Sequence, residues 1–236
     1  MKGILYYTDN QAQEKILLAC RKQLKRCQGN MPLVSVSQYP IDFGFNIVLP
    51  LKSQLISMFR QIVAGLEDLS VDTVFLAEHD VLYHPSHFDF TPPKDDIYYF
   101  NTNVWTVKSD TGEALYFDGA RRNSGLVASR KILLEHFTKK IEKARTFFAS
   151  TTRGFGRKVG YEPGKKKGRD DYRAVEFKSE FPNLDIKHGR NITKPRFKLS
   201  AYQHGGERVK DSWVLTDEVP YWGKTGGRFD DFIRGV

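Results

Sequence analysis

The chain has 236 residues, of which 40% are hydrophobic and 13% aromatic, a composition that supports a folded core and excludes a disordered tail. Its apolar runs are much shorter than the ~20 residues that span a bilayer, and its first residues lack the pattern of a secretion signal. We therefore expect a cytoplasmic protein with no membrane partner. The formal net charge of +9 is compatible with a polyanionic partner.

The first eighty residues alternate between strand and helix patterns. Apolar runs predict strands, and amphipathic periodicity predicts helices, in the order strand 4–7, helix 12–26, strand 33–37, helix 53–69 and strand 74–77. The stretch 40–50 is expected to be a loop. This order is typical of a parallel sheet covered by helices, which binds ligands beyond the carboxyl ends of its strands.

Weaker patterns follow in the rest of the chain. They predict a strand at 97–100 and a helix from Ser124 to Phe137, opened by Asn123 or Ser124. Residues 151–171 contain five glycines and three consecutive lysines without apolar periodicity, which predicts a loop. No stretch has the composition of a domain linker, so we predict a single α/β domain over 1–236.

Two of the predicted strands end in polar residues, Thr8-Asp9-Asn10 and Glu78-His79-Asp80. The carboxylates of Glu78 and Asp80 are two residues apart, where both can face a cleft if the strand has already turned. Mg²⁺ and Mn²⁺ prefer such oxygen ligands and leave room for phosphate oxygens. The alternative is a polar turn that only ends a strand.

The segment 74–83, VFLAEHDVLY, resembles the strand and acid-x-acid motif of GT-A fold glycosyltransferases, with Glu at the first acidic position. The resemblance covers 1–110 and 174–197. It implies a Rossmann-like, mostly parallel sheet flanked by helices, with a donor half at 1–110 and an acceptor half at 111–236. It also implies that Asp80 binds Mn²⁺ or Mg²⁺, that Glu78 contacts a UDP-sugar donor, and that His79 is a turn residue.

A second segment, 185–193, matches the place where many members of this family supply a histidine to the metal. The resemblance assigns this role to His188, although an incidental histidine in an exposed basic loop is the alternative. The residues expected to contact the diphosphate are Asn191, Thr193, Lys194 and Arg196. Those expected near the nucleotide base or phosphate are Thr8, Asp9, Asn10 and Lys52; Ser53 beside Lys52 is otherwise an ordinary helix cap.

Positive charge is concentrated in the second part of the chain. Residues 1–100 hold 9 basic and 11 acidic residues, whereas segment 153–173 alone holds 8 basic and 3 acidic residues. Basic groups along a glycine-rich loop can follow a phosphate backbone, and nearby aromatic rings can stack on bases. The candidate DNA contacts are Arg153, Arg157, Lys158, Lys165, Lys166, Lys167 and Arg169. The alternative is a solvated loop.

The small size and the basic second part are similar to bacteriophage glycosyltransferases that modify DNA bases. This resemblance implies hexosyl or pentosyl transfer from a UDP-sugar to a hydroxymethyl pyrimidine in DNA, in the host cytoplasm if the chain is phage-encoded. An inverting transfer needs a carboxylate to take the proton of the acceptor hydroxyl. We expect Asp171 in this role, with Asp118, Glu176 and Asp170 as further candidates.

The sequence is also compatible with other functions. A glycosyltransferase of this kind could use a glycan, lipopolysaccharide or protein acceptor. A metal-dependent phosphoesterase or nuclease could use Glu78, Asp80 and His188, with His84 and His87 nearby in the sequence. A non-catalytic DNA-binding protein would explain the charge alone. The sugar, its anomeric outcome and the oligomeric state are not indicated.

Overall fold

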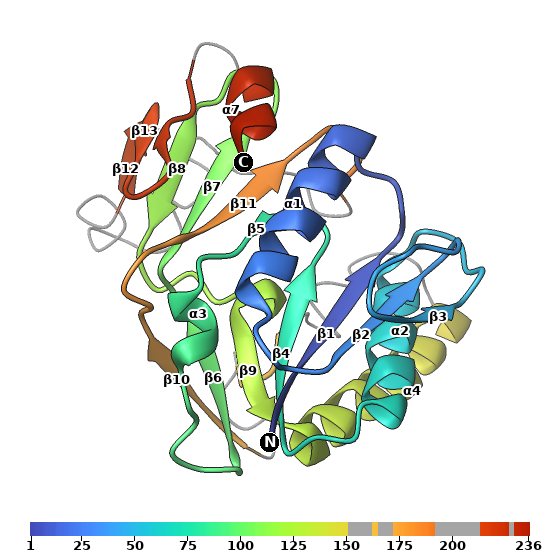
Figure 1. Cartoon of the computed structure of the whole chain (residues 1–236). Coiled ribbons are helices and arrows are strands. Elements are labelled where there is room, and N and C mark those ends of the chain that lie inside the picture. Colours follow the sequence, from blue (N-terminus) through green and yellow to red (C-terminus); the bar gives the residue numbers. More distant parts are fainter. Residues whose placement is uncertain (151–161, 165–171, 192–212, 227–228) are drawn as a thin grey trace.

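The computed structural model describes residues 1–150, 162–164, 172–191, 213–226 and 229–236 (Figure 1). Within these residues a seven-stranded and a five-stranded sheet lie side by side, with helices on both faces of the larger one, and β13 (Glu218–Val219) and β14 (Gly223–Lys224) form a separate two-stranded sheet. None of the helices in the described part of the chain combines the length and the apolar composition needed to cross a bilayer. Apart from 162–164, the predicted loop at 151–171 lies outside the described residues.

The larger sheet has seven strands, of which only β9 runs against its neighbours. In spatial order they are β10 (Arg173–Phe177), β6 (Ile97–Asn101), β9 (Leu126–Ser129), β4 (Thr73–Glu78), β1 (Lys2–Thr8), β2 (Leu33–Ser37) and β3 (Phe45–Val48). All other neighbouring strands pair in parallel. The predicted α/β class, with a mostly parallel sheet flanked by helices, is therefore confirmed.

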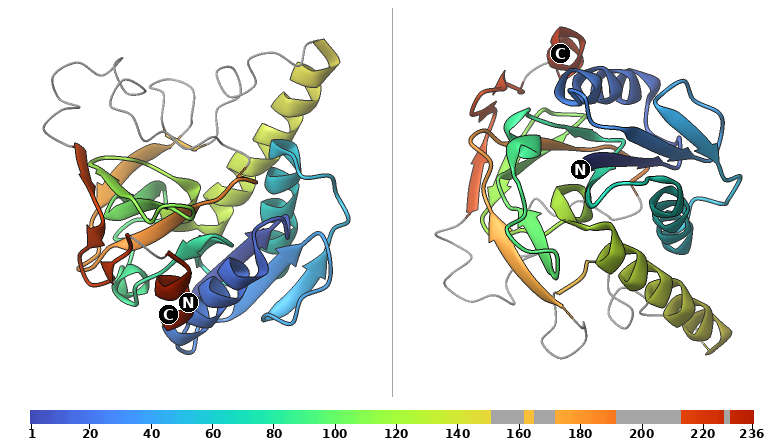
Figure 2. Two further views of the ribbon diagram at one scale, coloured as in Figure 1. Left: turned by 90° about the horizontal axis from the view of Figure 1, so that it is seen from above. Right: turned by 60° about the horizontal axis from the view of Figure 1, so that its bottom comes forward.

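Helices cover both faces of this sheet. α1 (Glu14–Cys27) lies on one face, and α2 (Leu55–Asp68) and α4 (Arg130–Ser150) lie on the other (Figures 1 and 2). Each helix buries one apolar stripe, as periodic hydrophobic residues dictate. α2 comes especially near β1 because Gly65 has no side chain: a Cβ there would lie 2.1 Å from Cδ1 of Leu5.

The smaller sheet has the order β12 (Trp213–Thr216), β8 (Ala114–Phe117), β7 (Val104–Lys108), β11 (Asn183–Lys187) and β5 (Val81–Leu82). The chain enters it from the larger sheet three times, from β4 to β5, from β6 to β7 and from β10 to β11. Each crossing starts at the carboxyl end of a strand of the larger sheet. That edge is therefore lined by chain segments that connect the two sheets.

The remaining elements are short. They are α3 (Ser86–Asp89), the 3-10 helix η1 (Asn123–Gly125), β13 (Glu218–Val219), β14 (Gly223–Lys224) and α7 (Phe229–Gly235). The last helix packs against α1, where Lys15 pairs with Asp230 at 2.5 Å. Closer to β14, the Thr225 hydroxyl donates to the Gly112 carbonyl at 2.7 Å, which holds the C-terminal segment beside the smaller sheet.

Two predicted boundaries are wrong. The expected loop 40–50 contains the edge strand β3, whose Phe45 is 61% exposed, so its sequence carries little of the apolar signal of a buried strand. The helix expected from Ser124 begins only at Arg130, after η1 and strand β9, whose first three residues are buried. A short apolar run such as 126–129 is compatible with either a helix or a strand, and pairing with β4 and β6 decides for the strand.

Candidate metal centre

Asp80 and His188 are brought together by the pairing of β5 with β11. Asp80 lies in the turn between β4 and β5, and the backbone N–H of Ile186 donates to its carbonyl at 2.8 Å. Because β11 runs antiparallel to β5, the end of β11 lies beside the start of β5. His188, directly after β11, therefore reaches Asp80, with its Nε2 3.6 Å from Oδ2 of the carboxylate.

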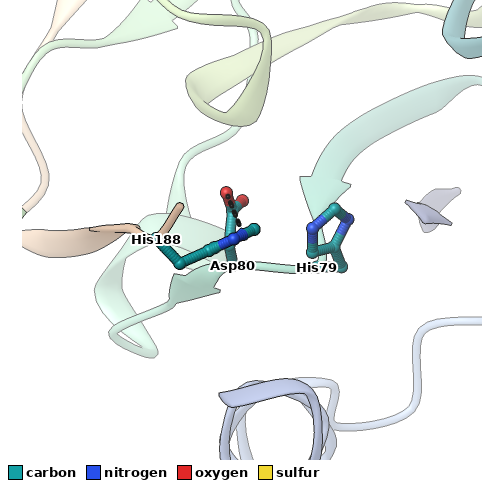
Figure 3. Close-up of side chains that lie close together, drawn as sticks. All are labelled: His79, Asp80 and His188. Carbon is teal, nitrogen blue, oxygen red and sulfur yellow. Dashed lines mark ion pairs between the residues drawn. The ribbon is translucent and has the colours of Figure 1, made fainter. Parts of the chain in front are cut away.

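His79 lies on the other side of Asp80 (Figure 3). One ligand atom from each of His79, Asp80 and His188 lies within 4.8 Å of the other two. Two ligands of one ion, each about 2.1 Å from it, are at most about 4.2 Å apart, so these three side chains are close to a shared coordination geometry. In the described part of the chain they are the one such group of three or more histidines, cysteines and carboxylates.

One ring nitrogen of each histidine in this group lacks a hydrogen bond, whereas Nδ1 of His188 accepts from the backbone N–H of Arg190 at 3.3 Å. The Nε2 atoms of His79 and His188 are both buried and have no hydrogen-bond partner among the described residues. Only 2% of the His188 side chain and 6% of the Asp80 side chain are exposed. Because a buried polar atom without a partner is costly, the unpaired nitrogens fit ligands of a cation.

Asn191 fixes the two predicted ligands relative to each other. Its Nδ2 donates to Oδ2 of Asp80 at 2.7 Å, and its Oδ1 accepts from the backbone N–H of His188 at 2.6 Å. The sequence predicted a contact of Asn191 with a diphosphate. Its side chain holds the Asp80 carboxylate and the His188 loop, a position that would orient both residues toward a metal. The contact with a diphosphate stays a prediction.

Glu78, at the end of β4, is held by two tyrosines. Its Oε1 accepts a 2.6 Å hydrogen bond from the Tyr7 hydroxyl, and its backbone N–H donates to the Tyr83 hydroxyl at 3.0 Å. Burial and the nearby charge of Asp80 raise the pKa of Glu78 to about 7. Burial and the charge of Glu78 raise the pKa of Tyr7, so its hydroxyl remains a donor.

A buried ion-pair network lies behind the turn. Asp185 accepts from Arg122 at 2.5 Å through Oδ2 and pairs with Lys187 at 2.8 Å through Oδ1. Burial acts against the charge of Lys187, but Asp185 and Asp80 raise its pKa. Burial likewise acts against the charge of Asp80, yet the proximity of His79, His188 and Lys187 lowers its pKa.

Negative charge exceeds positive charge around this turn. The ionisable residues that meet here are four carboxylates and two cations: Asp9, Glu78, Asp80, Asp185, Lys187 and Arg122. With neutral histidines, these six residues carry a net charge of −2 when all four carboxylates are ionised, and −1 when Glu78, whose pKa is raised to about 7, is protonated. Buried charges require pairing or a metal, so a divalent cation bound by Asp80 would balance the group.

The loop after β1 is packed against this turn. Asp9 is 7% exposed, accepts from the Ser53 hydroxyl through Oδ2, and lies with Oδ1 3.9 Å from Nε2 of His79. Thr8 and Asn10 are also tied to the protein, since Thr8 Oγ1 accepts from the N–H of Asn10. Lys52 is exposed. The roles of these residues in nucleotide binding remain predictions.

Two of the candidate bases lie close together. Asp118 pairs with Lys178 at 2.8 Å, and Glu176 accepts from Arg121 at 2.9 Å. A Cβ on Gly119, next to Asp118, would lie 3.6 Å from Oε2 of Glu176. Both carboxylates are partly exposed, and Arg121 is followed by the arginine that binds Asp185.

Several predicted site residues cannot be placed. Those outside the described residues are Arg153, Arg157, Lys158, Lys165, Lys166, Lys167, Arg169, Asp170, Asp171, Thr193, Lys194 and Arg196. Their roles stay predictions. Gly164, between two of these stretches, accepts from Arg121 through its carbonyl at 3.2 Å, which brings residues 162–164 beside the candidate bases.

The sequence did not predict which residues surround Asp80 in the turn between β4 and β5. His79 was expected to be only a turn residue, and Lys187 and Arg122 were given no role. The signal was present, because His79 stands between the two acids and Lys187 directly precedes His188. Of the further histidines considered for a nuclease, His87 lies in an aromatic core, where its Nδ1 accepts from the Asn101 amide at 3.0 Å. His84 forms a 2.8 Å hydrogen bond with the Ser86 hydroxyl.

No family model and no curated protein matches the chain. Its fold resembles a glycosyltransferase involved in glycosylation of the major capsid of PBCV-1, with a TM-score of 0.47 and 10% identity over 75% of this chain and 81% of that one. It also resembles the bifunctional IspDF from Campylobacter jejuni (TM-score 0.43, 10% identity, 76% of this chain and 50% of that one). A third likeness is to the glycosyltransferase GlyE of Streptococcus pneumoniae TIGR4 (TM-score 0.43, 12% identity, 74% and 45%).

Proposed function

We propose that the protein is a metal-dependent glycosyltransferase that moves a sugar from a UDP-sugar to a hydroxymethyl pyrimidine in DNA. The observation that carries the proposal is the meeting of Asp80 and His188 at the carboxyl edge of β4, 3.6 Å apart and buried. Ligands of doubly wound sheets bind at this edge. The two residues stand at the positions that the resemblance to GT-A glycosyltransferases assigns to the metal.

The side chains around Asp80 suit a nucleotide-sugar donor. A divalent ion held by Asp80 and His188 would supply charge compensation for the departing diphosphate. Lys187 and Arg122 add positive charge behind the same turn. Glu78, fixed by Tyr7, presents a carboxylate to a hydroxyl of the ribose or the sugar.

The acceptor side of the proposal rests on charge. Residues 111–236 contain the excess of basic residues, and 162–164 lie beside Asp118 and Glu176. A carboxylate there can take the proton of the acceptor hydroxyl as the bond to the sugar forms. Asp171 remains the first candidate for this base, with Asp118 and Glu176 as the alternatives. A base within duplex DNA would have to leave the stack to reach it.

The test is a transfer assay with the full chain, Mn²⁺, radiolabelled UDP-sugars, and duplex DNA containing hydroxymethylcytosine or hydroxymethyluracil. Label should enter modified DNA but not unmodified DNA of the same sequence, and Asp80→Asn should abolish it. Label that enters only glycan, lipopolysaccharide or protein acceptors would refute the DNA acceptor and keep the transferase. Cleavage of DNA without sugar transfer would refute both.

A further inference from the structure

His79 has an environment that a turn residue does not need. Its ring lies beside the His188 ring, with centroids 5.9 Å apart, and its Nε2 is 3.9 Å from Oδ1 of Asp9. That separation is too long for a hydrogen bond, and the nitrogen is buried without another partner among the described residues. The side chain is nevertheless 84% shielded, so its placement is defined by the surrounding protein.

Two explanations fit an imidazole between carboxylates. A protonated ring could act as a counter-ion for Asp9 and Asp80, or a neutral ring could offer its lone pair to a cation. The geometry favours the second, because the buried Nε2 of His79 has no hydrogen bond to either carboxylate, whereas one ligand atom of His79 lies within 4.8 Å of ligand atoms of both Asp80 and His188. The second also explains why two neighbouring histidines, His79 and His188, both have a buried nitrogen without a hydrogen bond.

We infer that His79 is the third protein ligand of the metal. The centre then consists of two imidazoles and one carboxylate, His79, His188 and Asp80, and selects a first-row transition ion over Mg²⁺. This inference deepens the proposed function, in which Asp80 and His188 bind the metal. It adds a ligand from the middle of the acid-x-acid motif and names the class of ion.

The ion class follows from ligand chemistry. Mg²⁺ demands near-ideal octahedral geometry, takes oxygen ligands and keeps most of its waters, whereas imidazole suits zinc, iron, nickel and copper. Among the first-row transition ions, Mn²⁺ lies at the weak end of the affinity series for such sites. Three protein ligands on one side leave other coordination positions open for oxygens of a substrate.

The test uses the full chain and metal alone, without any nucleotide sugar. Wild type, His79→Gln and the matched control His84→Gln are titrated with Mn²⁺ and Mg²⁺ by calorimetry. We expect Mn²⁺ to bind wild type at least about 100-fold more tightly than Mg²⁺, and His79→Gln to lose about 30-fold in Mn²⁺ affinity. His84→Gln should stay within about 3-fold of wild type. Circular dichroism shows whether each variant is folded.

A second readout counts the ligands directly. Pulsed electron paramagnetic resonance on bound Mn²⁺ should show two histidine nitrogens in wild type and His84→Gln, and one in His79→Gln. One nitrogen in the wild type, equal Mn²⁺ affinity in His79→Gln, or equal affinities for Mg²⁺ and Mn²⁺ would overturn the inference. The wild-type count decides the matter even if His79→Gln does not fold. Two nitrogens without any sugar transfer would refute the proposed reaction and keep this centre.

Discussion

The proposed metal centre depends on side chains that hold its candidate ligands as well as on those ligands themselves. Asn191 bonds to both the Asp80 carboxylate and the backbone of His188, and Tyr7 bonds to Glu78. Such outer contacts fix the direction of each ligand, and losing one typically costs 10-fold to 100-fold in metal affinity. Their individual removal therefore tests the geometry without removing a ligand.

Asn191→Ala should lower Mn²⁺ affinity by about 10-fold, because Asp80 then rotates freely and the His188 loop loses its 2.6 Å hydrogen bond. Calorimetric titration of Mn²⁺ measures the change. Arg190→Ala, at the preceding exposed residue, is the control and should bind as wild type does. Equal affinities for the two variants would show that Asn191 does not orient the ligands.

Tyr7→Phe should raise the pKa of Glu78 further above about 7, because the Tyr7 hydroxyl donates to the ionised carboxylate and favours it. An increase of about half a unit to one unit is expected from one lost hydrogen bond. Titration of carbon-13-labelled glutamate in the metal-free protein by nuclear magnetic resonance measures it. Tyr98→Phe, whose hydroxyl bonds to Ile132 instead, should leave the value unchanged; a lower pKa in Tyr7→Phe would contradict the assignment.

At the scale of elements, the close contact of α2 with β1 positions the loop after β1 next to the turn between β4 and β5. Gly65→Ala in a helix interior is usually stabilising. Here the added methyl would meet Leu5 and Val36, both buried, at 2.1 and 3.0 Å. We therefore expect a loss of about 1–3 kcal/mol from overpacking, measured by urea unfolding.

Gly235→Ala is the matched control for this substitution. Gly235 belongs to α7, and a Cβ there would have no atom within 4 Å. Its free energy of unfolding should change by no more than about 0.5 kcal/mol. If Gly65→Ala is as stable as Gly235→Ala, α2 can move away from β1 without cost.

Periodicity predicted the elements whose own residues define a buried face. α1 and α2 each carry a long apolar stripe, and β1 and β4 are continuous apolar runs. β3 and β9 could not be predicted in this way, since they are four residues long and pairing with other strands determines them. Strand pairing is a long-range interaction that a local pattern does not contain.

The same limit applies to the site. Asp80 and His188 could be proposed from a motif, but their contact depends on the antiparallel pairing of β5 with β11. The sequence did not predict that the side chain of His79 lies beside that of Asp80. Side chains of consecutive residues in a strand point to opposite faces, but His79 and Asp80 lie in a turn, where this alternation does not hold. The ion pair between Arg122 and Asp185 joins residues 63 positions apart, a separation that no local pattern indicates.

At the scale of the whole molecule, stability should depend on pH through a histidine remote from the site. His87 is fully buried among Phe75, Tyr83 and Phe88, and burial lowers its pKa to about 3. Between about pH 3 and 6.5 the unfolded chain binds a proton here and the folded chain does not, so acidification favours unfolding. Stability is lost as pH falls through 6.5.

From this single group, lowering the pH from 7.5 to 5 should cost wild type about 2 kcal/mol of unfolding free energy. His87→Gln should be less stable at pH 7.5 because it loses ring packing, but it should lack this part of the pH dependence. Urea unfolding of both proteins at the two pH values measures the difference. An equal loss of unfolding free energy in the two proteins would contradict this prediction. It would show that His87 is protonated in the folded protein or does not cause the pH dependence.

The central claim is that Asp80 and His188 form a metal site that binds a nucleotide sugar where the two sheets meet. The most direct measurement is calorimetric titration of UDP-sugars into the full chain, with Mn²⁺ present and with Mn²⁺ removed by a chelator. We predict binding with Mn²⁺, at least about 10-fold weaker binding without it, and no Mn²⁺ effect in Asp80→Asn. Binding that is equally tight without Mn²⁺, or the same Mn²⁺ effect in Asp80→Asn, would contradict the claim.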